Sequence, residues 1–218
     1  WRSMQIRACL RTRDLPLQLP VRALPSRKWW KELCATEDEQ HQAADMRRPH
    51  KDTTTMDLKP ILFRDAPVTA DTARVQEIIE SSGFFSPQEI EVAQELVEER
   101  LTKGISSGYL FLFAEAEGRV IGYTCYGPIP CTMESYDLYW IAVEQTLRGT
   151  GFGRELLQRT EQAIGRAGGS RIYVETSSRE LYESTRGFYG ACGYGEAAVL
   201  EDFYAPGDHK VIYLKVLS

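Results

Sequence analysis

The chain of 218 residues has a formal net charge of −5, from 26 lysines and arginines against 31 aspartates and glutamates. Its charge is uneven, because residues 1–56 hold 11 basic and 7 acidic side chains, net +4, whereas residues 57–218 hold 15 and 24, net −9. An acidic main part argues against a nucleic-acid partner, and no apolar run is long enough to cross a membrane. The length suits one or two domains with a buried core.

The cysteines and histidines form no pattern typical of a disulfide framework or a metal site. The five cysteines are odd in number, none forms a Cys-x-x-Cys pair, and no secretory segment is visible. We therefore expect reduced thiols and a cytoplasmic protein. His41, His50 and His209 are too far apart for metal-ligand spacing, so we expect no metal.

The first 56 residues lack a sustained hydrophobic period. They mix arginine, glutamine, aspartate and threonine, and four prolines interrupt any long helix. We expect residues 1–56 to be a poorly structured basic extension, and residues 57–218 to be the folded domain.

A strand and two helices are predicted first in this domain. The strand covers residues 61–64, and Asp71 or Thr72 caps the first helix. The second helix begins at Ser86, because serine followed by proline, with glutamate three residues on, predicts a capping box. Gly104 ends it.

The rest of the chain alternates strands and helices. A hairpin turns at Glu117-Gly118, and residues 127–130 form a loop. The further elements are a strand at 136–144, a helix at 155–167, a strand at 171–176, a helix at 181–192, and strands at 195–203 and 210–216. The order β-α-α-β-β-β-α-β-α-β-β predicts a mixed α/β sheet.

The segment richest in information is Arg148-Gly149-Thr150-Gly151-Phe152-Gly153-Arg154, between a predicted strand and a predicted helix. Glycines let several N–H groups converge on one anion, and a helix start adds unpaired N–H groups and a positive dipole end. This pattern predicts a phosphate cradle, with a plain strand-to-helix turn as the alternative. Its spacing matches neither Gly-x-x-x-x-Gly-Lys-Ser/Thr nor Gly-x-Gly-x-x-Gly.

Arg-x-x-Gly-x-Gly in this setting resembles the acyl-CoA-binding motif of the GNAT N-acetyltransferase superfamily. Residues 187–194 are similar to the family's Phe-Tyr-x-x-x-Gly-Phe/Tyr segment. The resemblance covers residues 58–218 and implies a GNAT-type, mostly antiparallel sheet flanked by helices.

This resemblance implies an enzyme that transfers the acetyl group of acetyl-CoA to a primary amine by direct attack in a ternary complex. The acceptor would be a small molecule or a peptide, and a homodimer is compatible with it. Two alternatives stay open. One is a non-catalytic acyl-CoA-binding module, and the other is an interaction protein whose basic extension is the functional part.

The resemblance also places acetyl-CoA along a strand and the glycine run. Many relatives carry an asparagine where this chain has Tyr182, and Ser177, Ser178 or Thr185 would replace its contact. The other residues implied are Ile141, Ala142, Val143, Arg148, Gly149, Thr150, Gly151, Phe152, Gly153 and Arg154.

Tyr189 occupies the tyrosine position of the family segment and is the expected general acid, because a phenol with a pKa near 10 stays protonated at neutral pH. The alternative is a packing residue. The resemblance implies Asp137 as the general base, because many relatives carry a catalytic or water-ordering glutamate at this position, six residues before Val143; Glu134 and Glu175 are alternatives. A solvated or ion-paired structural role is equally compatible with each carboxylate.

The resemblance implies that acceptor specificity comes from the loop between the first two helices and from the last hairpin, here residues 83–86 and 201–208. Both segments combine aromatic and polar or acidic side chains, which suit a cationic, partly apolar amine. An ordinary surface turn with core aromatics is the alternative.

Overall fold

The computed structural model describes residues 61–217. These residues belong to one compact unit, Thr54–Ser218. The extension predicted at residues 1–56 lies outside the described residues.

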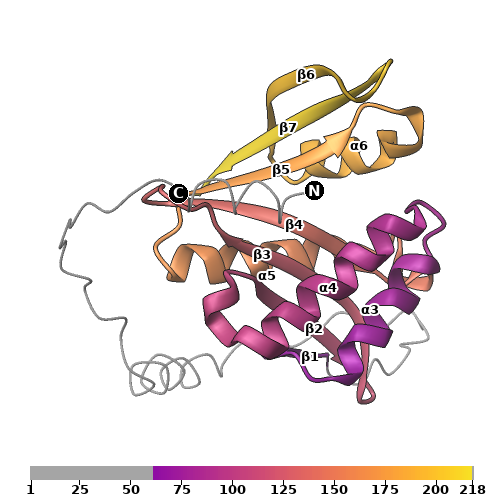
Figure 1. The fold of residues 1–218 in the computed structure, drawn as a ribbon, viewed down its shortest axis with the longest axis vertical. Helices are drawn as coiled ribbons and strands as arrows, with labels where there is room; N and C mark the ends of the chain where they lie inside the picture. The colour runs from indigo at the N-terminus through magenta and orange to yellow at the C-terminus, as the bar shows by residue number, and fades with distance from the viewer. Residues whose placement is uncertain (1–60, 218) are drawn as a thin grey trace, which may run out of the picture. The chain divides into compact units, whose positions relative to one another are not determined.

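Seven strands of the described part form one sheet in the order β1-β2-β3-β4-β5-β7-β6 (Figure 1). The strands are β1 (Leu62–Arg64), β2 (Leu110–Ala116), β3 (Arg119–Pro128), β4 (Ser135–Val143), β5 (Arg171–Ser177), β6 (Gly195–Ala205) and β7 (Asp208–Val216). The β4–β5 pair is parallel, and the other neighbouring pairs in this region are antiparallel. The predicted mixed, mostly antiparallel sheet and the predicted order of elements are both confirmed.

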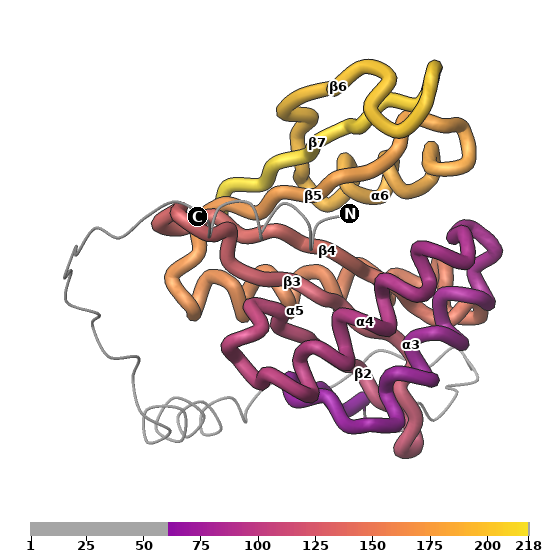
Figure 2. Tube along the Cα trace, in the orientation of Figure 1, coloured from indigo at the N-terminus to yellow at the C-terminus, as the bar shows by residue number. Residues whose placement is uncertain are grey.

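The helices cover both faces of the sheet (Figures 1 and 2). They are α3 (Ala70–Glu80), α4 (Pro87–Lys103), α5 (Phe152–Arg166) and α6 (Glu183–Ala191), with short 3-10 helices η1 (Gly104–Ser107), η2 (Gln145–Leu147) and η3 (Glu180–Tyr182). Phe111 and Phe113 of β2 pack against α3 and α4. The alternating residues Leu110 and Leu112 pack in a cluster with α5 and α6, as expected for successive side chains of a strand.

The starts of the first two helices differ in how well they were predicted. Helix α4 begins as expected, because the Ser86 side chain accepts the N–H of Glu89 at 3.3 Å and the Glu89 carboxylate accepts the N–H of Ser86 at 2.8 Å. Helix α3 begins at Ala70, so the predicted cap at Asp71 or Thr72 is wrong. The Asp71 carboxylate instead pairs with Arg64 of β1 at 2.5 Å.

Two other boundaries also move. The expected loop at 127–130 starts later, because Gly127 and Pro128 still pair with Asp137 and Tyr136 of β4. Helix α5 begins at Phe152, three residues before its predicted start, so its first turn lies inside the glycine run.

Strands β4 and β5 stay together over only part of their length. They pair from Ser135 to Leu138. The register of β4 against β3 then shifts by one residue, and Tyr139 is the extra residue of this bulge. A bulge bends and twists its strand, and beyond it β4 diverges from β5 (Figure 1). The backbone edge of residues 140–143 therefore has no ladder partner on β5.

Candidate active site

A cleft of about 900 Å³ opens where β4 and β5 diverge. One wall is β4 from Tyr139 to Val143, and the other comprises the end of β5 and one side of α6. The glycine run after β4 closes one part of the cleft. The α3–α4 loop and the β6–β7 hairpin line another part.

The glycine run forms an open cradle. Gly149 and Gly151 have φ values of 75° and 90°, the left-handed region that favours glycine. A Cβ atom at either position would meet no protein atom within 4 Å, so their backbone faces open space. Among the described residues, no hydrogen-bond partner occupies the N–H groups of Gly149, Gly151 and Gly153. These groups, at the start of α5, fit an anionic pyrophosphate.

The other members of the run contribute differently. Arg148 and Arg154 line the cleft. The Arg148 guanidinium lies 4.8 Å from the centre of the Phe84 ring, and burial lowers its pKa from the usual value. Phe152 is only 7% exposed and packs into the core. The Thr150 hydroxyl donates to the carbonyl of Leu147 at 2.7 Å, so neither side chain lines the cleft.

The β4 residues Ile141, Ala142 and Val143 line the cleft as expected. Their strand pairs with β3 along one edge. The opposite edge faces the cleft and leaves main-chain groups available to a ligand with amides of its own.

Tyr189 lies on the cleft wall and is 5% exposed. Its ring is surrounded by those of Phe188, Tyr194 and Tyr213, with centroids at 5.4, 5.6 and 6.0 Å. Burial raises the pKa of the Tyr189 phenol well above its usual value, so the phenol carries its proton throughout the neutral range. Tyr189 therefore packs among other rings and also borders the cleft. Its position is compatible with both the general-acid interpretation and the packing interpretation.

The structure brings one of the three candidate carboxylates to the cleft. Glu175 lines it, with an oxygen 2.9 Å from the Lys210 ammonium. Asp137 does not line it, because at this point β4 is still paired with β5 and Asp137 lies opposite Tyr173. Glu134 is exposed and accepts the Ser170 hydroxyl at 2.5 Å.

Ser177, Thr185 and Tyr182 all line the cleft, whereas Ser178 does not. The Ser177 hydroxyl donates to Asp208 at 2.5 Å. The Ser178 hydroxyl instead accepts the N–H of His209 at 2.8 Å. Ser177 is therefore held by the protein itself, which leaves Thr185 as the freer hydroxyl.

The two segments expected to face the acceptor do line the cleft in part, and the residues they supply are Phe84, Phe85, Ser86, Tyr204 and Asp208. Two charged lining residues, Glu89 and Arg179, were not predicted as site residues. Glu89 was recognised from sequence only as a helix cap. The one available signal was its position in the first turn of a helix that follows an acceptor segment.

A model of the acetyltransferase (GNAT) family matches residues 74–188, more than half of the chain. The chain belongs to this family. A crystal structure of a protein assigned to the GNAT acetyltransferase family, from Desulfovibrio desulfuricans, is 42% identical, with a TM-score of 0.71, over 73% of this chain and all of that one. The search of curated proteins found no match.

More distant GNAT structures share the fold. An aminoglycoside 6'-N-acetyltransferase complexed with coenzyme A is 19% identical with a TM-score of 0.59, over 72% of this chain and 97% of that one. The ribosomal-protein-S18-alanine N-acetyltransferase from Escherichia coli is 16% identical with a TM-score of 0.56, over 73% and 95%. Within residues 61–217, no helix is long and apolar enough to cross a membrane, and no group of three or more potential metal ligands is present.

Proposed function

We propose that the protein is an acetyl-CoA-dependent N-acetyltransferase whose acceptor is a primary amine, a small molecule or a peptide. The observation that carries the proposal is one continuous cleft, which joins the glycine cradle to a wall of aromatic and acidic side chains. An amine and an acyl donor held together in this cleft could react directly in a ternary complex, without an acyl-enzyme step.

The donor end fits acetyl-CoA. The N–H groups of Gly149, Gly151 and Gly153 would hold the pyrophosphate, with charge from Arg148 and Arg154. The open edge of β4 would bind the pantetheine amides. Bound acetyl-CoA would supply the thioester that is attacked.

Tyr189 is the proposed general acid. Its buried phenol keeps its proton at neutral pH and lines the cleft, where a departing thiolate would need one. Because burial raises the pKa of the phenol, it stays protonated and can donate a hydrogen bond to the departing thiolate.

Glu175 is the proposed base among the three candidates, because it alone lines the cleft. Its carboxylate is already engaged in the ion pair with Lys210. A route through a water molecule is therefore expected, because an alkyl ammonium with a pKa of about 10.4 must lose a proton before it attacks.

The decisive experiment measures thiol release from acetyl-CoA with a library of amines, alongside calorimetry of acetyl-CoA binding. Amine-dependent thiol release is the expected result. Binding without release from any amine would instead identify a non-catalytic acyl-CoA-binding module. We also propose that residues 57–218 are the catalytic domain, so deletion of residues 1–56 should leave thiol release intact.

A further inference from the structure

Aromatic rings dominate the acceptor part of the cleft. Phe85 of the α3–α4 loop packs on Trp140 of β4 with ring centroids 5.0 Å apart, and both line the cleft. Tyr182 and Tyr204 add rings from η3 and β6. Such a wall buries an apolar or aromatic body and attracts a cation placed over a ring.

Two cations near this part of the cleft, Arg179 and Lys210, already have acidic partners. Arg179 Nε lies 3.2 Å from Asp208, and the Lys210 ammonium lies 2.9 Å from Glu175 and 3.6 Å from the centre of the Phe203 ring. A substrate carboxylate would have to break one of these pairs in order to bind Arg179 or Lys210.

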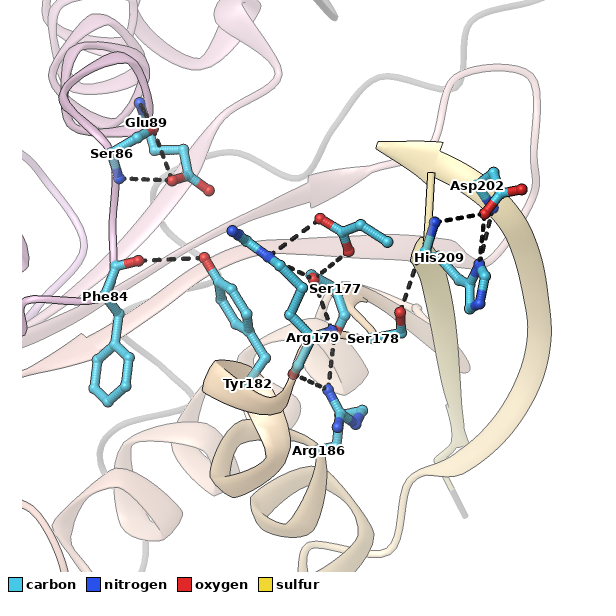
Figure 3. A network of polar contacts seen from close by, with 12 residues as sticks. Phe84, Ser86, Glu89, Ser177, Ser178, Arg179, Tyr182, Arg186, Asp202 and His209 are labelled. Carbon is cyan, nitrogen blue, oxygen red and sulfur yellow. Dashed lines mark hydrogen bonds and ion pairs between the residues drawn. The ribbon is translucent and has the colours of Figure 1, made fainter. Parts of the chain in front are cut away.

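Glu89 adds a negative charge that no cation of the described residues neutralises. Its carboxylate accepts the Ser86 N–H at 2.8 Å and the Ser86 hydroxyl at 2.9 Å (Figure 3). These bonds hold the carboxylate at the start of α4, on the lining of the cleft. Burial raises the pKa of Tyr182, and the charge of Glu89 raises it further, so the field of Glu89 reaches into the cleft.

We propose that the acceptor is a primary amine on an apolar or aromatic skeleton without a carboxylate, and that Glu89 is the residue that discriminates against acidic acceptors. The inference rests on the proposed function and names the substrate class of the same cleft. The aromatic wall binds the body of the acceptor. Glu89 attracts its ammonium group before deprotonation and repels a carboxylate attached to the same carbon.

The test compares three probes: phenethylamine, phenylalaninamide and phenylalanine. The last two differ in the charge of the carboxyl group. Binding is measured by calorimetry with coenzyme A present, and turnover by thiol release from acetyl-CoA. We expect phenylalanine to bind and react at least tenfold more weakly than its amide, the scale of one nearby charge–charge repulsion.

The variant Glu89→Gln removes the charge but retains the capping box, because glutamine serves at that position as well as glutamate. It should reduce the difference in affinity between phenylalaninamide and phenylalanine by about tenfold. In turnover, the change should appear mainly in KM. The matched control is Glu91→Gln, which makes the same charge change on the same helix at an exposed residue outside the cleft lining. This control should leave the difference in affinity between phenylalaninamide and phenylalanine unchanged.

Any of three results would overturn the inference. Phenylalanine and its amide bind equally well, the difference in their affinities is unchanged in Glu89→Gln, or neither carboxylate-free amine binds. The two readouts separate it from the proposed function. Discrimination in binding without thiol release would support the inference about the ligand class and overturn the proposed enzymatic function. Thiol release without discrimination would support the enzymatic function and overturn the inference.

Discussion

The hydroxyl of Tyr182 donates a hydrogen bond of 3.4 Å to the carbonyl oxygen of Phe84, although 98 residues separate them (Figure 3). Tyr182 ends η3, on the β5 side of the cleft, and Phe84 lies in the α3–α4 loop. The Phe84 ring also contacts the guanidinium of Arg148. One loop residue is therefore linked both to the cradle and to the opposite wall.

Tyr182→Phe should loosen the α3–α4 loop without unfolding the protein. The long hydrogen bond is expected to contribute no more than about 1 kcal/mol to stability, and the ring keeps its packing. We expect faster hydrogen exchange across residues 81–86 and a higher KM for the amine, with the midpoint of urea unfolding nearly unchanged. Unaltered exchange in this loop would show that the bond does not restrain it.

Gly153→Ala should weaken acetyl-CoA binding at least tenfold, measured by calorimetry, because the new methyl group would lie in the cradle that we propose holds the pyrophosphate. The backbone at Gly153 is not in the left-handed region, and its new Cβ would lie 3.7 Å from the Phe188 ring, an ordinary contact. Alanine also favours a helix over glycine by up to about 1 kcal/mol, so the fold should not suffer.

Gly165→Ala is the matched control for this change. It lies on the same helix, and its new Cβ would also meet a side chain at 3.7 Å, here Leu217. Acetyl-CoA affinity should stay at the wild-type level. If both variants bind equally well, the cradle assignment fails.

Tyr189→Phe should reduce kcat by about a hundred- to ten-thousand-fold, the usual span for one proton-transfer group. Acetyl-CoA affinity should change little, because the cradle lies on other residues. Since burial raises the pKa of Tyr189 well above its usual value, ionisation of this phenol should cause no loss of wild-type activity up to about pH 10. Steady-state kinetics from pH 6 to 10 checks both statements, and wild-type kcat in the variant would make Tyr189 a packing residue.

Tyr126 should make stability fall between pH 10 and pH 12. Burial, followed by the charge of Asp65, raises its pKa from 10.0 to about 12. Below pH 10 both states keep the proton. Above it the unfolded chain ionises first, so stability is lost as pH rises, by about 3 kcal/mol for two pKa units. Urea unfolding from pH 8 to 12 should show a shallower fall in Tyr126→Phe; parallel curves for the two proteins would refute this.

Local signals predicted the elements well. The capping box at Ser86 and Glu89 lies within four residues, and the hairpin turn at Glu117-Gly118 is equally local, so both could be predicted from the chain alone. The start of α3 could not be predicted in this way. Its apparent cap, Asp71, is taken by Arg64 of a neighbouring strand, and a partner from another element leaves no mark on the local pattern.

In the candidate site, too, features set by local sequence could be predicted, whereas features set by contacts between elements could not. The glycine run could be predicted as a cradle because glycine itself permits the left-handed backbone angles that Gly149 and Gly151 adopt. Asp137 was favoured as a base because the family resemblance implies a carboxylate at its position. Strand β4 leaves β5 at a bulge one residue beyond Leu138, however, and the sequence shows no sign of this bulge. Glu89 was predicted only as part of a capping box, and nothing in that local pattern indicates that its side chain also lines the cleft.

The bulge at Tyr139 has a consequence for engineering. By freeing one edge of β4, it would leave recognition of the acyl donor mainly to the main chain. The α3–α4 loop, the start of α4 and the β6–β7 hairpin, in contrast, line the cleft with side chains. A combinatorial library at Phe84, Phe85, Glu89 and Tyr204 should therefore retarget the protein to new amines while its donor preference stays constant. Substitutions along β4, in contrast, would alter packing before they altered donor choice.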